Sequence, residues 1–348
     1  MIIFLILALC SLGDLLLNHR FQIGDCIEKG LQSCGSLLLC MGGWYAILIP
    51  FIQTNIESIT KILSILPFDS SIIVGCILAP DMGATPIIQT LTLHHSLIAY
   101  SGVLLTSTLG CFISFQLPIF TSQVTKDDYP VLMKGFVKGI IALGFVMLPL
   151  AWILQIPNPF LNTLPIAIVT ILLALSLRFA ANQTIKVLSI FANIIRMISY
   201  GLFFFLAIFF FLEVPFVSKA AAMEICYVVL KMSIVITGSL VLCKLIQRFA
   251  TKALSNFAQR LGMNEASLMG LFLSCASSLA MLPLFDNMDD KGKQCNAAFS
   301  ISGAYCLGGQ FAYIASVLPQ YALLFVIVKL LAGILSLFFS LYSKSRER

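Results

Sequence analysis

The sequence predicts an all-α polytopic membrane protein with two inverted repeats, about nine spanning helices and two re-entrant helical hairpins. The composition, the distribution of basic residues and an internal repeat carry this prediction. Of the 348 residues, 59% are apolar and 10% are charged, and the mean hydropathy is +1.01. Soluble domains carry about 25% charged residues. The chain is therefore expected to lie in a lipid bilayer.

Each predicted spanning helix is an apolar run of about 20 residues, the length that crosses the hydrocarbon core. Two further apolar segments, 71–93 and 267–287, are interrupted by proline and polar residues. The first run has no positively charged start and contains Asp14, which predicts an uncleaved helix and not a signal peptide. The predicted spans lie at 1–17, 31–54, 97–119, 132–155, 160–178, 194–214, 223–245, 297–317 and 321–342.

Basic residues indicate that the two interrupted segments turn back instead of crossing. With both segments re-entrant, all but four of the lysines and arginines fall on one side of the membrane. Lys61 and Lys219 fall on the other side, while Lys231 and Lys329 lie inside predicted spans. If both segments crossed, no clear bias would remain. Because cytoplasmic loops carry the excess of Lys and Arg, the N-terminus is predicted outside and the C-terminus in the cytoplasm.

An internal repeat supports the same topology. Residues 66–75 (LPFDSSIIVG) align with residues 261–270 (LGMNEASLMG), each just before an interrupted segment. Asp69 and Asn264 match as predicted helix N-caps, since their side chains can accept from the first free backbone N–H groups. Shorter matches follow at 99–101 with 298–300 and at 110–112 with 309–311.

The repeat divides the chain into three parts. The first repeat covers 1–155, a connecting helix and linker cover 156–190, and the second repeat covers 191–348. The single connecting helix gives the two repeats opposite orientation, so the hairpins enter from opposite sides. Inverted repeats with paired discontinuous helices are typical of secondary transporters, whose site lies where the tips meet.

The first interrupted segment holds one carboxylate, Asp81, between Pro80 and Gly83. Proline breaks the helix at this point, and the preceding half-helix directs its carbonyl ends at the break. An unpaired carboxylate in hydrocarbon is costly and usually functional, so Asp81 is predicted to bind a small cation. The alternatives are that it caps the second half-helix or pairs with Lys231 or Lys329.

The second interrupted segment offers hydroxyl groups instead of a carboxylate. Ser274, Ser277 and Ser278 precede Pro283 and are candidate ligands for a polar substrate. Serines in membrane helices also bond back to the helix or ease packing, and that alternative stays open. Asp14 is expected to have a structural use, either snorkelling to the membrane surface or pairing with a cation.

The helices after both hairpins are predicted to be smooth. Small residues recur every four positions in each, which favours close helix packing over a pore lining. Gln310 lies near the end of the second stripe and is a candidate hydrogen-bonding group in a cavity. The stripes are Gly102, Thr106 and Gly110 in the first helix and Ser300, Ala304 and Gly308 in the second.

Several function classes are disfavoured by missing motifs. The eleven cysteines include no CxxC pair or His-flanked cluster, so neither a metal site nor a cofactor is predicted. HExxH, GxSxG and a phosphate-binding glycine loop are missing, which argues against an enzyme. No basic nucleic-acid motif occurs. The sequence therefore indicates transport of a small molecule.

Two motifs resemble the ethanolamine permease family of bacterial ethanolamine-utilisation systems. Residues 75–83 (GCILAPDMG) are similar to the small-residue run of that family that ends in Asp-Met-Gly-Gly. Residues 287–299 (NMDDKGKQCNAAF) resemble its Met-Asp-x-[Lys/Arg]-Gly-Lys stretch and the Asn-x-Ala-Phe that follows. Glu28-Lys29-Gly30 agrees more loosely. The resemblance covers most of the chain.

The resemblance implies uptake of ethanolamine, a small amino alcohol that is largely protonated at neutral pH, across a bacterial inner membrane. Asp81, with Met82 and Gly83, would bind the ammonium group. The hydroxyl groups of the second tip or Gln310 would then bind the alcohol.

The chain departs from the family pattern at three places. Ser277-Ser278-Leu279-Ala280 stands where the family carries Asn-Asn-Ile-Pro, Gly308-Gly309-Gln310 where it carries Gly-Asp-His, and Ala84 where it carries Gly. Two alternatives therefore stay open. One is a transporter of a different small polar solute on the same fold, and the other is a non-transporting membrane sensor or assembly subunit. A homo-oligomer is compatible with either.

Overall fold

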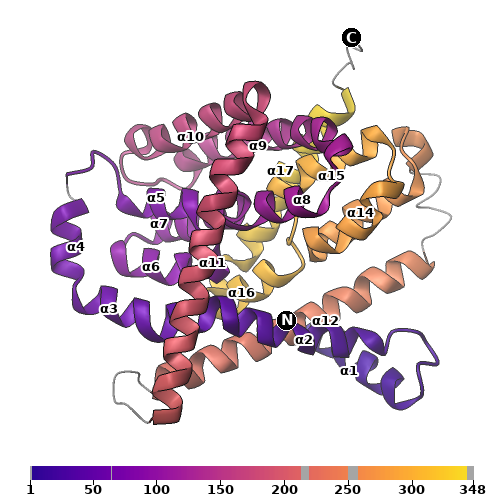
Figure 1. Ribbon diagram of the computed structural model, residues 1–348, viewed down its shortest axis with the longest axis horizontal. Helices are drawn as coiled ribbons and strands as arrows, with labels where there is room; N and C mark the ends of the chain where they lie inside the picture. Colours follow the sequence, from indigo (N-terminus) through magenta and orange to yellow (C-terminus); the bar gives the residue numbers. More distant parts are fainter. Residues whose placement is uncertain (1, 64, 213–218, 250–257, 343–348) are drawn as a thin grey trace.

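The computed structural model describes residues 2–63, 65–212, 219–249 and 258–342, which form helices and no strand (Figure 1). The first half contains α1 (Ile2–Leu16), α2 (Asp25–Gly43), η1 (Trp44–Leu48), α3 (Ile49–Thr54), α4 (Ile56–Leu63), α5 (Ser70–Ile77), η2 (Pro80–Met82), α6 (Ala84–Leu91), α7 (His95–Leu97), η3 (Ile98–Gly110), η4 (Phe112–Gln116), α8 (Leu117–Gln123), η5 (Lys126–Asp128) and α9 (Tyr129–Ile153). After α10 (Pro159–Phe179) come α11 (Ala181–Leu212), α12 (Lys219–Phe249), α14 (Glu265–Ala276), η6 (Ser278–Asn287), α15 (Asp290–Ser302), α16 (Gly309–Val317), η7 (Pro319–Tyr321) and α17 (Ala322–Tyr342). The η segments are 3₁₀-helices, except that η1, η3 and η4 are π-helices.

The all-helical fold is that of a multi-pass membrane protein. Within the described ranges, five helical stretches are long and apolar enough to cross a bilayer. The other predicted spans overlap helices that fall outside this set, among them α1, α2 and α11. The five stretches are His95–Thr121, Tyr129–Ile153, Pro159–Phe179, Ile225–Leu242 and Pro319–Tyr342.

The prediction of one smooth helix over 297–317 is wrong. Residues 303–308 separate α15 from α16 and are not helical. In this break the backbone N–H groups of Tyr305 and Leu307 donate to carbonyls of α14, each at 2.9 Å. Because these amides bond to the second hairpin and not to the preceding turn, the helix cannot continue through them.

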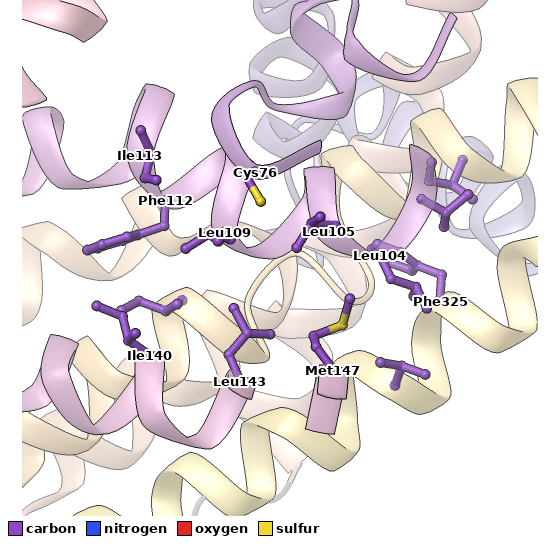
Figure 2. Close-up of a cluster of buried hydrophobic side chains, with 14 of the residues drawn as sticks. Cys76, Leu104, Leu105, Leu109, Phe112, Ile113, Ile140, Leu143, Met147 and Phe325 are labelled. Carbon is purple, nitrogen blue, oxygen red and sulfur yellow. The ribbon is translucent and has the colours of Figure 1, made fainter. Parts of the chain in front are cut away.

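The run of helix from α7 to α8 (residues 95–123, the central helix) forms the core. Every residue of η3 is buried. Figure 2 shows Leu109 and Phe112 of this helix packed with Ile140 and Leu143 of α9, in the same cluster as Phe325 of α17. The central helix is therefore surrounded by protein, whereas α10 and α17 keep apolar faces exposed.

Glycines bring helices of the two halves into backbone contact. α1 packs along α12, and α2 packs along both α11 and α12 (Figure 1). A Cβ atom added to Gly238 would lie 2.3 Å from the carbonyl oxygen of Phe4, and one added to Gly43 would lie 2.4 Å from the backbone of Leu202. No side chain fits at such a distance, so these crossings depend on glycine.

Asp14 organises the turn between α1 and α2. Its carboxylate accepts from the backbone N–H groups of Phe21, Ile23 and Gly24 at 2.6, 2.7 and 2.8 Å. The expected structural use of Asp14 is confirmed, but its partners are backbone amides and not a cation.

The start of α2 is held by an ion pair. The ammonium of Lys244 lies 2.5 Å from the carboxylate of Asp25. This hydrogen bond holds the pKa of Asp25 below its usual value. The pair joins α2 of the first half to α12 of the second.

Candidate functional site

The first hairpin is broken around Asp81, as predicted. α5 begins at the N-cap Asp69, which accepts from the N–H of Ser71 at 2.9 Å, and it ends before Pro80. One short 3₁₀ turn, η2, carries Asp81 and Met82. Gly83 then adopts φ +83°, a left-handed conformation that favours glycine. The break therefore holds the carboxylate between two half-helices.

Asp81 has no cationic partner in the described part of the chain. Asp81 is partly exposed. The ion pairs in the described part of the chain are formed by the carboxylates of Asp25 and Asp128. The ammonium of Lys329 donates to the carbonyl of Ser107 at 2.8 Å, and that of Lys231 lies 5.9 Å from the ring centroid of Tyr227. The alternative that Asp81 pairs with one of these two lysines is therefore wrong.

The second hairpin is broken at Ser277. Asn264 caps α14 as predicted, accepting from the N–H of Ser267 at 2.9 Å. α14 ends at Ala276, and Ser277 is extended, with φ −158° and ψ 124°. A Cβ atom added to Gly308 would lie only 1.5 Å from the carbonyl oxygen of Ala276, so the break between α15 and α16 closes directly on the end of this half-helix.

A chain of hydrogen bonds joins the central helix to both breaks of the second half. Gln116 donates through Nε2 to the carbonyl of Ser300 at 2.7 Å and to Oγ of Ser278 at 3.3 Å. Ser278 in turn donates to the hydroxyl of Tyr305 at 2.8 Å. Tyr305 has φ +62°, which is rare for an aromatic residue and is held by its backbone bond to Ser274.

The two breaks meet at Tyr305. Its ring belongs to a buried cluster with Ala79 and Met82 of the first tip and with Cys111 of the central helix. η2, which carries Asp81, also contacts α16. Tyr305 therefore lies in one buried cluster with residues that flank Asp81.

Four buried side-chain atoms of the described residues have no hydrogen-bond partner. They are Oε1 of Gln116, Oγ of Ser274, Oδ1 of Asn296 and Oε1 of Gln310. Gln310 is the second residue of α16, and its side chain lies beside the Cys111 thiol. Buried polar atoms are nearly always hydrogen-bonded in native proteins. Each of these atoms is thus left to accept a hydrogen bond from a ligand.

The predicted site residues therefore have different positions. Asp81, Met82 and Gly83 lie at the break after α5. Ser274 lies in the last turn of α14, Ser277 and Ser278 lie at the break after it, and Gln310 lies in α16. Among the described residues no group of three His, Cys, Asp or Glu side chains is placed to hold a metal ion. A groove of about 500 Å³ between α9 and α10 is lined by apolar side chains and contains none of these residues.

Sequence reasoning missed Gln116 and Tyr305. Gln116 is 1% exposed and is the one amide side chain in the run 97–119, whose other polar residues are serines and threonines. Tyr305 interrupts the small-residue stripe at 300–308, but the expectation of a smooth helix there concealed it. Gly102 and Gly110 of the first stripe do pack closely against the first hairpin, as predicted.

Residues 1–342 match the family described as ethanolamine utilisation protein, EutH. The chain belongs to this family. A protein of Listeria monocytogenes named probable ethanolamine permease EutH is 27% identical, and the match covers 99% of this chain and 93% of the relative. Proteins of the same name from Escherichia coli K12 and Salmonella typhimurium are 26% and 25% identical, covering 89% of this chain and 83% of each relative.

These identities make the chain a divergent member of the EutH family. The relatives named for a function are named as permeases and not as enzymes. No solved structure matches this EutH family member.

Proposed function

We propose that this EutH family member is a transporter, and not an enzyme, that carries a small polar cation, most favourably ethanolamine, across the bacterial inner membrane. The observation that carries the proposal is the unpaired Asp81 carboxylate at a helix break. A carboxylate in a membrane interior without a counter-ion is costly. A protonated amine bound beside it supplies the missing positive charge.

The electrostatics of the first break favour a cation. The C-terminal end of α5 faces the break, and the last carbonyls of a helix carry partial negative charge. Asp81 adds a full negative charge on η2. The buried Lys329 is engaged with Ser107 and the ring of Phe325 and does not neutralise Asp81. The full charge of Asp81 outweighs the partial positive charge at the start of α6, so the break attracts an ammonium group.

The inverted-repeat architecture is part of the proposal. A Cβ atom on Gly110 would lie 2.2 Å from the carbonyl oxygen of Leu78, and one on Gly308 would lie 1.5 Å from that of Ala276. Each glycine thus closes on the last carbonyl before a hairpin break, at the same separation along the chain in both halves. The crossed contacts of α1 with α12 and of α2 with α11 also fit a two-fold relation.

The proposed binding site lies between the two tips. Asp81 and Met82 contribute from the first hairpin, and Gly83 provides the turn between its half-helices. Ser274, Ser277 and Ser278 contribute from the second hairpin, with Gln310 beside them. Re-entrant tips that enter from opposite sides allow access from one side at a time. The bias of basic residues supports an outside N-terminus and a cytoplasmic C-terminus.

The decisive experiment is uptake of labelled ethanolamine into vesicles that contain the purified protein. Asp81→Asn removes the charge with little change in shape, and saturable uptake should fall about tenfold or more because a charge-assisted bond is lost. Asp127→Asn is the matched control, since Asp127 is an exposed aspartate of η5. Its uptake should be unchanged, and both variants should elute as folded protein from a sizing column.

The possible outcomes separate the alternatives. Unchanged uptake by Asp81→Asn would falsify the role of Asp81. Saturable flux of another polar solute but not of ethanolamine would keep the fold-level proposal and change the substrate. If vesicles show no saturable flux of any amine, the protein is a sensor or an assembly subunit.

A further inference from the structure

We propose that Tyr305 is a specificity-determining residue, which recognises the substrate hydroxyl through a hydrogen-bond chain that starts at Gln116. The site would then select small protonated amino alcohols over amines that lack a hydroxyl and over amino acids. This inference rests on the proposed transport function. It assigns a role to two residues outside the predicted site.

The chain of hydrogen bonds has a direction. The Gln116 Nε2 group can only donate, and it donates to the Ser300 carbonyl and to Ser278. Ser278 accepts that bond and donates its own hydrogen to Tyr305. The hydroxyl hydrogen of Tyr305 is then left to donate, either to the neighbouring Ser277 hydroxyl or to a ligand. Tyr305 therefore offers a donor, and the hydroxyl oxygen of an amino alcohol is an acceptor.

Most of the unpaired buried atoms on the elements of the proposed site are acceptors. The amide oxygens of Gln116 and Gln310 have no partner, and the carboxylate of Asp81 adds further acceptor sites. A protonated amino alcohol carries several N–H donors and one O–H donor, with a single neutral acceptor oxygen. That balance matches the site, because an unsatisfied buried acceptor destabilises the empty site until a donor reaches it.

The same balance disfavours solutes with a carboxylate. The amino acid serine has the structure of ethanolamine with a carboxylate added. The oxygens of an ionised carboxylate accept hydrogen bonds but cannot donate them. Those oxygens would face Asp81 and the two unpaired glutamine oxygens. Choline keeps the hydroxyl but lacks N–H donors, so it leaves these acceptors unsatisfied. Both solutes should therefore bind more weakly than ethanolamine.

The position of Tyr305 is fixed by the backbone. Its left-handed conformation is maintained by the bond from its N–H to the carbonyl of Ser274, at 2.9 Å. Its ring belongs to the same buried cluster as Met82, the residue after Asp81. The hydroxyl is thus held next to the proposed ammonium site. A two-carbon amino alcohol places its hydroxyl a short distance from its nitrogen and suits this arrangement.

The test compares binding of ethanolamine and ethylamine to the purified protein, by competition against labelled ethanolamine in a scintillation proximity assay. In the unaltered protein ethanolamine should bind about tenfold or more tightly than ethylamine, since only ethanolamine satisfies Tyr305. In Tyr305→Phe this ratio should fall to about one through weaker ethanolamine binding, with ethylamine unchanged. L-serine and choline should compete poorly throughout.

Tyr100→Phe is the matched control. Tyr100 is fully buried in the central helix, and its hydroxyl donates to the carbonyl of Met147 at 2.9 Å. It should keep the unaltered ratio. If Tyr305→Phe does not fold, Ser278→Ala removes the donor that orients Tyr305 and should lower the ratio in the same direction.

The results distinguish this inference from the proposed function. A ratio unchanged in both Tyr305→Phe and Ser278→Ala, with binding still dependent on Asp81, overturns the role of Tyr305 alone. Competition by L-serine as strong as that by ethanolamine overturns the selection against carboxylates. Selective binding without any vesicle uptake keeps the role of Tyr305 and rejects transport. No binding of any amine rejects both.

Discussion

The two helices that follow the hairpins differ in one respect that decides the geometry of the site. The central helix of the first half runs unbroken from residue 95 to residue 123, with its middle wound as a π-helix. Its counterpart in the second half is interrupted at 303–308. In both halves a glycine closes on the end of the preceding half-helix. The halves thus share a contact but not a backbone path.

The difference shows how two similar halves can supply unlike chemistry. The unbroken helix places the side chains of Cys111 and Gln116 along a buried face. The broken helix directs Tyr305 into the cluster that includes Met82. One half therefore supplies a charge on a tip, and the other supplies a hydrogen-bonding aromatic residue. A substrate with two unlike ends, an ammonium and a hydroxyl, fits such an asymmetric site.

The shared glycine contact should show the largest effect on folding. In Gly308→Ala and in Gly110→Ala the new methyl group would overlap a backbone carbonyl oxygen, 1.5 Å and 2.2 Å away. Since backbone cannot move aside as a flexible side chain can, each destabilisation should exceed the about 1–3 kcal/mol typical of overpacking. Neither variant should yield a sharp peak in fluorescence-detected size-exclusion chromatography.

Gly201→Ala is the control for this pair, because nothing lies within 4 Å of its added Cβ. It should behave as the unaltered protein. If one of the two tight glycines tolerates alanine while the other does not, the halves are not equivalent at this contact. The two-fold relation in the proposal would then lose its main support.

Much of the first half's geometry was predictable from local sequence. Asp69 as an N-cap, Pro80 as a helix breaker and Gly83 as a turn residue act within a few positions of themselves. Asp81 was found because a charge in an apolar run is conspicuous. Asn264 was predicted through the same capping chemistry, and the structure confirms it.

The break at 303–308 was not predictable in the same way. Its cause is a pair of backbone bonds to Ser274 and Cys275, about 30 residues earlier in the chain. Small residues at this point are equally compatible with a continuous helix that packs closely and with a helix break, and no local signal distinguishes these two structures. Tyr305 was missed for this reason, and Gln116 because its partner Ser278 lies in the other half.

The start of α15 is held by a buried ion pair, whereas the start of the central helix is held by an exposed hydrogen bond. This difference gives a second way to test the comparison. At the start of α15, Lys293 pairs with Asp128 at 2.7 Å, and the two side chains are only 10% and 16% exposed. Lys293→Met leaves a largely buried carboxylate without its partner and should lower the free energy of unfolding by about 3–5 kcal/mol. A thermal unfolding series in detergent measures this loss.

The double variant Asp128→Asn with Lys293→Met isolates the pair. Because no charge is left unpaired, it should recover much of the stability lost in Lys293→Met. Equal losses in the single and double variants would mean that Lys293 acts through its contact with the ring of Phe285, 5.7 Å away, and not through the ion pair.

The smallest effect is expected at the start of the central helix, the counterpart of the start of α15. The hydroxyl of Tyr321, in η7, donates to the carbonyl of His95 at 3.1 Å, and this bond is exposed. Tyr321→Phe should lower the free energy of unfolding by about 0.5 kcal/mol, the lower end for a net hydrogen bond. Thermal unfolding should not distinguish it from the control Tyr342→Phe, since Tyr342 is 73% exposed.

Hydrogen exchange is the sharper measurement, since it reports local opening. Amides near His95 should exchange faster in Tyr321→Phe, while those near Lys293 stay protected. Such a result would show that the start of the central helix is held less firmly than the start of α15. If protection is unchanged near both His95 and Lys293, the two starts are equally firm, and the halves differ only at the breaks.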